Sequence, residues 1–414
     1  MRGLCLAAGV LLAAGPAATA GELRLAGFAW GRVGQTRGQP SWLEGGFGRL
    51  TEGARAAGAD SSFARGDLEL ALDWRPTPVL LVHAQGLAHG QPARDRGRVA
   101  GLSEAFVQYR PDLSAALTLR LRAGMFFPPT SRENVGPLWS SPYTLTFSAL
   151  NTWIAEELRL TGFESAVVLR SASGAELQVA GSAFGLADTS GTLLAWRGWS
   201  LGDRLTTLGE TLPLPPLTSL GPSGAFARQQ DAGTQPVEEL DGRIGWQIRG
   251  RWSRPGGALL QVAYLDTEGD RGLHRGQYAW YTHFAQVGGE LRLAGALRLL
   301  GEAAQGDTGM GPAVGAHVDL RFRVGYLLLT WGGERARASL RYDHFENTDR
   351  DGTAEPNNES GSAWTAAVLW SPQRHLRLGA EFLSLRSQRP AAAFSGADPT
   401  TDARRLLLEA RLGF

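Results

Sequence analysis

Histidines, serines and carboxylates are the side chains that could catalyse a reaction in this sequence, and their spacing argues against a known active site. The seven histidines are scattered, and no two stand four residues apart as a zinc-binding helix requires. They are His83, His89, His274, His283, His317, His344 and His375. The motifs H-E-x-x-H and G-x-S-x-G and a phosphate-binding loop are absent. We therefore predict no enzyme and no cofactor, with a Ser-His-Asp site assembled from distant strands, in a barrel hydrolase, as the alternative.

Metal ligands are also sparse. The only cysteine, Cys5, lies in the first twenty residues, so the rest of the chain has no disulfide, thiol nucleophile or cysteine metal site. Asn347, Asp349 and Asp351 stand at alternate positions before a glycine, as the ligands of a calcium loop do. The twelfth position of that loop is Asn358 instead of glutamate, and a solvated acidic loop is the ordinary explanation. We predict no metal site, with this loop as the calcium candidate.

The charges of the chain nearly cancel. There are 41 basic and 40 acidic residues among 414, a net charge of +1, which does not favour nucleic acid as a partner. All of the basic residues are arginines. Guanidinium groups suit phosphate and carboxylate ligands because they present a planar fork of donors.

The first twenty residues have the composition of a secretory signal. Arg2 supplies the positive charge, residues 4–14 form a short apolar segment, and Ala18-Thr19-Ala20 is a small-residue cleavage site. Cleavage there leaves residues 21–414 as one domain. Beyond residue 20 no run of 18 apolar residues occurs, which excludes a helical membrane protein.

Period-two alternation recurs along the remaining chain. Apolar residues from Leu406 to Phe414 alternate with Arg405, Glu409 and Arg411, so one face of this segment is greasy and the other charged. Sixteen such segments begin near residues 22, 64, 79, 102, 116, 156, 175, 240, 258, 277, 296, 315, 334, 362, 375 and 404. The pattern predicts an all-β protein of about sixteen strands.

The connections between these segments alternate in length. Seven are short turns, and eight are long polar loops at about 32–62, 89–101, 128–155, 185–238, 267–276, 306–314, 346–361 and 387–403. A closed antiparallel barrel that spans the bacterial outer membrane has short periplasmic turns and long external loops. Trp74, Tyr109, Trp252 and Trp370 stand on apolar faces at the short-turn ends, where an interfacial girdle is expected. We predict a transmembrane barrel; a soluble sandwich or propeller is the alternative.

Two segments resemble known outer-membrane proteins. The terminal strand, with Leu412 and Phe414, looks like the signal read by the barrel-insertion machinery. Residues 122–134, R-A-G-M-F-F-P-P-T-S-R-E-N, and 148–159 are similar to the step from a strand into the third loop in phosphate-selective porins of the O and P type and their uncharacterised relatives. The resemblance implies a sixteen-stranded homotrimeric porin whose third loop folds into the lumen. The chain departs from that family in having no lysine.

If the apolar face points outward, the opposite parity gives the pore lining. The predicted lining residues are Asp67, Glu69, Glu104, Arg120, Arg122, Arg243, Arg249, Arg251, Arg321, Arg323, Arg337 and Arg341. The predicted constriction is the loop at 128–155, whose apolar side chains would hold it against the wall while its polar groups face the passage. Those polar groups are Arg132, Glu133, Asn134, Asn151, Glu156 and Glu157. An excess of inward arginines predicts a mild preference for anions.

These observations together predict a passive outer-membrane porin for small hydrophilic solutes. Its expected partners are outer-membrane lipid and lipopolysaccharide, the insertion machinery, two further copies in a homotrimer, and small anions. An adhesin or a transporter of hydrophobic substrates is the alternative. An adhesin would rely on the long fourth loop, residues 185–238, whose apolar stretch 212–217 could instead cover a neighbouring subunit or the barrel mouth.

Overall fold

The computed structural model describes residues 21–90, 100–227, 230 and 233–414. The proposed signal, residues 1–20, lies outside this range, so its cleavage stays a prediction. Among the described residues no helix is both long and apolar enough to cross a membrane.

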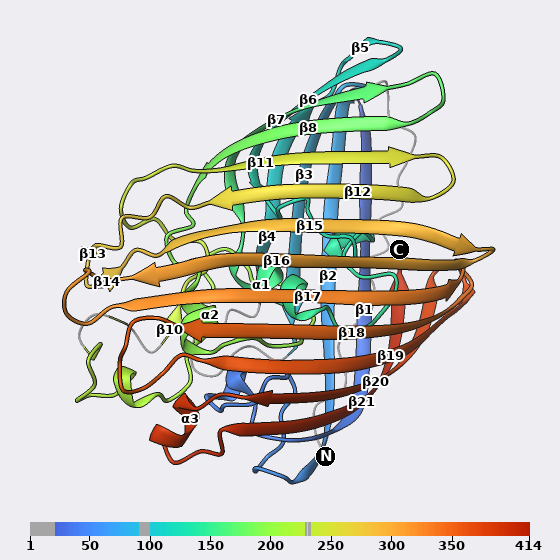
Figure 1. Ribbon diagram of the computed structural model, residues 1–414. Helices are drawn as coiled ribbons and strands as arrows, with labels where there is room; N and C mark the ends of the chain where they lie inside the picture. Colours follow the sequence, from blue (N-terminus) through green and yellow to red (C-terminus); the bar gives the residue numbers. More distant parts are fainter. Residues whose placement is uncertain (1–20, 91–99, 228–229, 231–232) are drawn as a thin grey trace.

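Sixteen long strands form one closed antiparallel sheet, as predicted (Figure 1). Each strand pairs with the next, and β1 pairs with β2 on one side and β21 on the other. At the closure the Phe414 N–H donates to the Gly27 carbonyl at 3.0 Å. The strands are β1 (Glu22–Arg37), β2 (Asp60–Thr77), β3 (Leu80–His89), β4 (Ala100–Tyr109), β6 (Leu117–Phe126), β7 (Leu160–Arg170), β8 (Glu176–Gly185), β11 (Gly245–Arg254), β12 (Ala258–Asp266), β15 (Tyr281–Ala294), β16 (Leu297–Met310), β17 (Val318–Gly332), β18 (Ala336–Asp349), β19 (Glu359–Gln373), β20 (Leu376–Gln388) and β21 (Thr400–Gly413).

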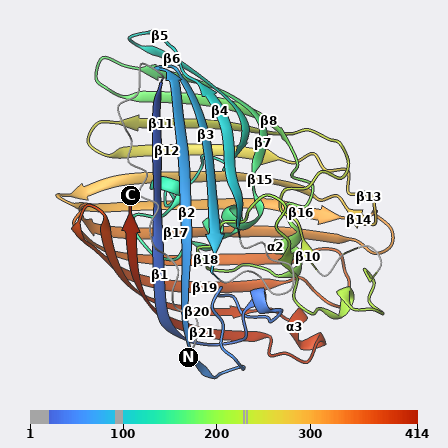
Figure 2. The ribbon, with the colours of Figure 1, turned by 180° about the vertical axis from the view of Figure 1, so that it is seen from behind.

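The remaining elements are short and lie in the connections. The strands are β5 (Asp112–Ser114), β9 (Leu212–Pro213), β10 (Gly233–Thr234), β13 (Leu273–His274) and β14 (Gln277–Tyr278). The helices are η1 (Trp42–Glu44), η2 (Pro137–Trp139), α1 (Ala149–Glu157), α2 (Thr192–Trp196), η3 (Thr218–Leu220) and α3 (Ala391–Phe394). The tight turns gather at one end of the barrel and the long connections at the other (Figure 2).

Several strands begin four or five residues from the predicted position, and for two of them the contacts show why. A strand was expected from residue 156, but residues 149–157 are the helix α1, capped by the Ser148 hydroxyl, which accepts from the Asn151 N–H. Only after it does β7 begin, at Leu160. The strand expected from residue 240 begins at Gly245, because Asp241 is engaged in loop contacts. Its side chain accepts from the N–H groups of Arg243 and of Asp270, which lies in the connection between β12 and β15.

A hydrophobic core fills part of the barrel interior on the side of the long loops. Trp153 of α1 packs against Trp199, Phe284 and Phe322, with ring centroids 5.9, 5.3 and 5.3 Å away. A second cluster joins the fourth loop to the wall and includes Trp196 and Trp280. The sequence predicted a water-filled lumen, whereas this half is packed with apolar side chains, because several inward positions near the loops carry Leu, Phe or Val.

Candidate functional site: a basic cavity beside the third loop

Most of the predicted lining residues lie on the inner face. Alternating burial and contacts with the loop segments place nine of them inward, namely Asp67, Glu69, Glu104, Arg120, Arg122, Arg249, Arg251, Arg337 and Arg341. Their role in solute passage stays a prediction.

For three predicted lining residues the structure shows a different position from the one expected. Arg321 and Arg323 are exposed on the outer face of β17, because the apolar side chains on the opposite parity point inward. Among those, Phe322 is fully buried against Trp199. Arg243 precedes β11 and is exposed. On β17 the assumption that apolar side chains point outward is wrong, since the interior beside this strand is itself apolar.

Arg341 attaches the third loop to β18. Its fully buried guanidinium pairs with Glu133 of the loop and with Asp343 at 2.7 Å. It also donates to the carbonyls of Thr146 at 2.6 Å and Phe147 at 3.0 Å. A buried charge needs this many partners to offset its desolvation. The loop therefore packs against the inner wall at this point.

Other wall residues hold the same loop. Glu381 of β20 accepts from the Leu145 N–H at 2.6 Å and the Thr146 N–H at 3.0 Å. On the opposite side, Arg249 donates to the Pro129 carbonyl and Gln261 to the Thr130 carbonyl, each at 2.7 Å. Because these contacts come from strands far apart around the barrel, residues 128–155 extend across its interior.

The polar groups of this loop do not all face open space as expected. Glu133, Asn151, Glu156 and Glu157 are fully buried, which corrects that part of the prediction. Glu133 is held by Arg341, and Asn151 donates to Glu302 at 2.8 Å. Glu156 pairs with Arg197 at 2.5 Å. These groups connect the loop to the wall and to the fourth loop.

Glu157 holds α1 against the fourth loop. Its carboxylate accepts from the Trp153 indole N–H at 2.6 Å and from the Leu193 N–H at 2.8 Å. Burial raises the pKa of Glu157 to about 7, and these hydrogen bonds oppose the shift only in part.

Arg132 and Asn134 do line open space, a cavity of about 350 Å³ between the third loop and the wall. Five arginines surround this space, namely Arg120, Arg122, Arg132, Arg249 and Arg251. Its apolar side includes Phe106, Phe127 and Trp139, the last two stacked at 4.4 Å. We call this space the basic cavity.

The basic cavity holds more donors than acceptors. Glu164 of β7 is the shared partner of Arg120, Arg122 and Arg249, at 3.0, 3.1 and 3.1 Å. Among the described residues, the Nε atoms of Arg122, Arg132 and Arg249 are buried and have no hydrogen-bond partner. The same holds for the side-chain amides of Gln85 and Gln178. Such donors complement a ligand that is rich in acceptors, such as an anion.

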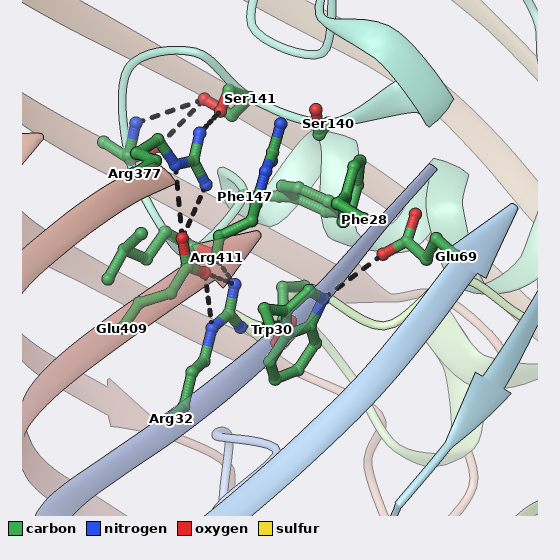
Figure 3. Close-up of a pocket in the computed structure, with 13 residues that line it drawn as sticks. Phe28, Trp30, Arg32, Glu69, Ser140, Ser141, Phe147, Arg377, Glu409 and Arg411 are labelled. Carbon is green, nitrogen blue, oxygen red and sulfur yellow. Dashed lines mark hydrogen bonds and ion pairs between the residues drawn. The ribbon is translucent and has the colours of Figure 1, made fainter. Parts of the chain in front are cut away.

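A second, much smaller cavity lies on the other side of the third loop (Figure 3). Its volume is about 20 Å³, the size of one water molecule. Figure 3 shows Arg32 and Arg377 converging on Glu409, at 2.7 Å each, with Ser140 and Ser141 of the loop opposite. This second cavity is therefore too small for a solute larger than water.

The calcium candidate is not assembled. Asn347 points inward, is buried, and accepts from the Trp199 indole N–H at 2.8 Å. Asp349 uses its carboxylate to accept the N–H groups of Asp351 and Asn357, as a loop-closing residue does. Among the described residues, the acidic side chains close enough to share an ion are Asp188, Glu239 and Asp241 in the fourth loop region.

Sequence analysis missed Glu164, Gln85 and Gln178 as members of the site. All three stand at inward parity on predicted strands, so that parity could have identified them. Nothing in the sequence shows that Glu164 lies under three arginines, because Arg249 is 85 positions away.

The structure is similar to outer-membrane porins along nearly its whole length. The outer-membrane channel DcaP of Acinetobacter baumannii is 11% identical with a TM-score of 0.55, over 97% of this chain and 100% of that one. OmpF of Salmonella typhi, in a complex with daunomycin, is 10% identical with a TM-score of 0.53, over 95% and 98%. The anion-selective porin of Comamonas acidovorans is 12% identical with a TM-score of 0.50, over 95% and 99%.

No protein-family model matches the sequence, and no curated protein matches it. The solved structures therefore establish the fold, a porin-type sixteen-stranded barrel. They do not assign the chain to the phosphate-selective type.

Proposed function

We propose that the chain is a passive diffusion channel of the bacterial outer membrane for small hydrophilic solutes, with a preference for anions. The observation that carries the proposal is the basic cavity. Five arginines surround it, and several buried donors there lack acceptors among the described residues. A fixed positive potential in a low-dielectric wall lowers the entry barrier for negative solutes.

The outer face supports a membrane location. Trp74, Tyr109, Trp252 and Trp370 are exposed at 45, 44, 41 and 52%, all at the short-turn end of their strands. Aromatic side chains at that level suit the boundary between lipid and water. Assembly as a homotrimer, insertion through the terminal residues Leu412 and Phe414, and a cleaved signal complete the proposal; both terminal side chains are exposed on the outside.

The packed interior bears on the size of the channel. Because the core around Trp153 and Trp199 fills the loop side, we infer that each protomer has a small conductance. The apolar stretch of the fourth loop packs into its own cluster: Leu212, Leu214 and Leu217 are buried. This stretch therefore offers little surface to an adhesin's partner.

A measurement of ion selectivity tests the proposal. We would replace Arg120 and Arg251 by glutamine and measure reversal potentials across planar bilayers in a salt gradient. Arg122 and Arg249 still pair with Glu164 in this variant. A unit charge about 10 Å away across water contributes about 0.4 kcal/mol, so the ratio of anion to cation permeability should fall about two- to four-fold.

The matched control is Arg321→Gln/Arg323→Gln, which also removes two positive charges, but from the outer face. Its permeability ratio should equal that of the wild type. An unchanged ratio in the double variant would refute the anion preference. A wild-type protein that never forms channels would instead favour the adhesin or transporter.

A further inference from the structure

Three outward-facing arginines lie on neighbouring strands near the loop end of the barrel, where its first and last strands meet. They are Arg386 of β20, Arg404 of β21 and Arg37 of β1. Each is exposed and stands at outward parity; the side chains of Arg386 and Arg404 are 75 and 59% exposed. Figure 2 shows β21 beside β1 at this seam. We call these three residues the seam arginines.

The seam arginines stand just above the apolar belt. On β21 the next outward residue toward the turns is Leu406, and on β20 Phe382 lies two outward positions below Arg386. Both apolar side chains are about half exposed, at 49 and 48%. One outward step is about 7 Å along a strand, so the guanidinium groups reach the level of the headgroups in the outer leaflet.

The positive charge at the seam is only partly compensated within the chain. Arg37 and Arg404 are directly opposite each other on adjacent strands, an arrangement that is unfavourable without a counter-ion. Asp402 lies 3.6 Å from Arg386 and 3.9 Å from Arg404, so one carboxylate serves both at a distance beyond a hydrogen bond. Asp60 is opposite Arg37 at the start of β2.

The same level on β16–β18 is different. There Arg321 pairs with Asp307 at 3.0 Å. Arg350 pairs with Asp307 at 2.7 Å and with Asp319 at 2.6 Å. On β16–β18 these arginines are therefore paired with aspartates of the same chain. At the seam, positive charge remains that an external anion could neutralise.

We propose that the seam arginines bind the phosphate groups of the glycolipid headgroup in the outer leaflet. Guanidinium groups bind phosphate with paired donors, and three of them on neighbouring strands suit a lipid with two separated phosphates, such as a bisphosphorylated disaccharide lipid. The site is distinct from the basic cavity because it faces lipid. It rests on the outer-membrane location proposed above.

The test compares lipid binding in detergent by native mass spectrometry. The full mature chain is titrated with bisphosphorylated lipid A, with the same lipid after removal of its phosphates, and with inorganic phosphate alone. The variant is Arg37→Gln/Arg386→Gln/Arg404→Gln, and the control is Arg321→Gln, whose charge is already paired. Heat-modifiable migration on a gel checks that each barrel is folded, and Arg404→Gln alone serves if the triple variant is not.

Wild type and control should retain lipid A equally, and the triple variant should bind it about 10-fold or more weakly. The single variant should show a smaller loss in the same direction. Equal binding of the dephosphorylated lipid, or wild-type affinity in the variants, would overturn the proposal. Tight binding of inorganic phosphate alone would also overturn it. Loss of the oligomer in the variants, with lipid binding intact, would overturn it as well, because it would show that a second copy of the chain covers the seam. Unchanged channel conductance in the variants separates this result from the proposed transport function.

Discussion

Replacement of Arg341 by methionine should detach the third loop from the barrel wall. The arginine is fully buried and pairs with Glu133 of the loop and Asp343 of its own strand. Methionine occupies much of the same volume but carries no charge, so both carboxylates would be left without their main partner. Four hydrogen bonds to loop residues Thr144, Thr146 and Phe147 and to Thr365 would also be lost.

The expected loss of stability follows from this burial. Removal of one member of a buried ion pair costs about 3–5 kcal/mol, because an uncompensated charge stays inside the protein. The hydrogen bonds are part of the same network and are not added separately. We expect the loop to open before the barrel does, since the backbone pairing of β18 with β17 and β19 is not changed.

Two assays measure the effect. Urea unfolding in phospholipid vesicles gives the free energy of unfolding, and limited proteolysis followed by mass spectrometry reports cleavage within residues 128–155. Planar-bilayer recording should show a larger and noisier conductance. The matched control is Arg341→Met/Glu133→Gln/Asp343→Asn, which removes all three charges and should recover at least half of the lost stability.

The reasoning fails if the single variant and the triple variant are equally stable, because the cost would then not arise from unpaired charge. It also fails if the loop of Arg341→Met stays as resistant to protease as that of the wild type. That result would mean that Glu381, Arg249 and the aromatic contacts hold the loop without Arg341.

Three further predictions concern the packed interior. Because burial raises the pKa of Glu157 to about 7 from 4.5, the folded state binds the proton of this group more tightly. The contribution of Glu157 to stability should therefore be largest below about pH 4.5 and fall by about 3 kcal/mol as the pH rises to 7, and Glu157→Gln should remove this component from the pH dependence of urea unfolding. Trp153→Ala should cost about 3–5 kcal/mol and raise the single-channel conductance, since it removes the centre of the loop-side core; an unchanged conductance would show that this core does not limit flow. Gly124→Ala should lower the yield of folded barrel, because φ is +132° and the new Cβ would lie 2.3 Å from the Ala105 carbonyl, while Gly250→Ala, with its nearest contact at 3.6 Å, should fold normally.

Some of the site could be predicted because strand parity is a local property. On β6, alternation alone places Arg120 and Arg122 on the face opposite Leu119 and Leu121, and the structure agrees. The same rule reversed the two faces of β17, where Arg321 and Arg323 face outward. Near the loops the inner face of β17 packs against Trp153 and Trp199. The apolar side chains of this strand therefore point inward.

The predicted constriction shows the same limit. The length and position of residues 128–155 indicated a loop that enters the barrel, but α1 within it was not recognised. Its burial on all sides leaves no amphipathic pattern to read. The polar residues Glu133 and Glu156 were expected to face the passage, and their arginine partners, 208 and 41 positions away, hold them inside the protein instead.

The amino-acid sequence alone determined that this chain forms a barrel of sixteen strands with turns at one end and long loops at the other. That information is local, since the period of two and the turn residues lie within each segment. Tertiary structure alone decided which side chains line open space and which are paired and buried. Pairing depends on where distant parts of the chain meet in space, as the ion pairs Arg249–Glu164 and Arg341–Glu133 show. No local pattern encodes that meeting, because the free energy that fixes it arises only when both partners leave water together.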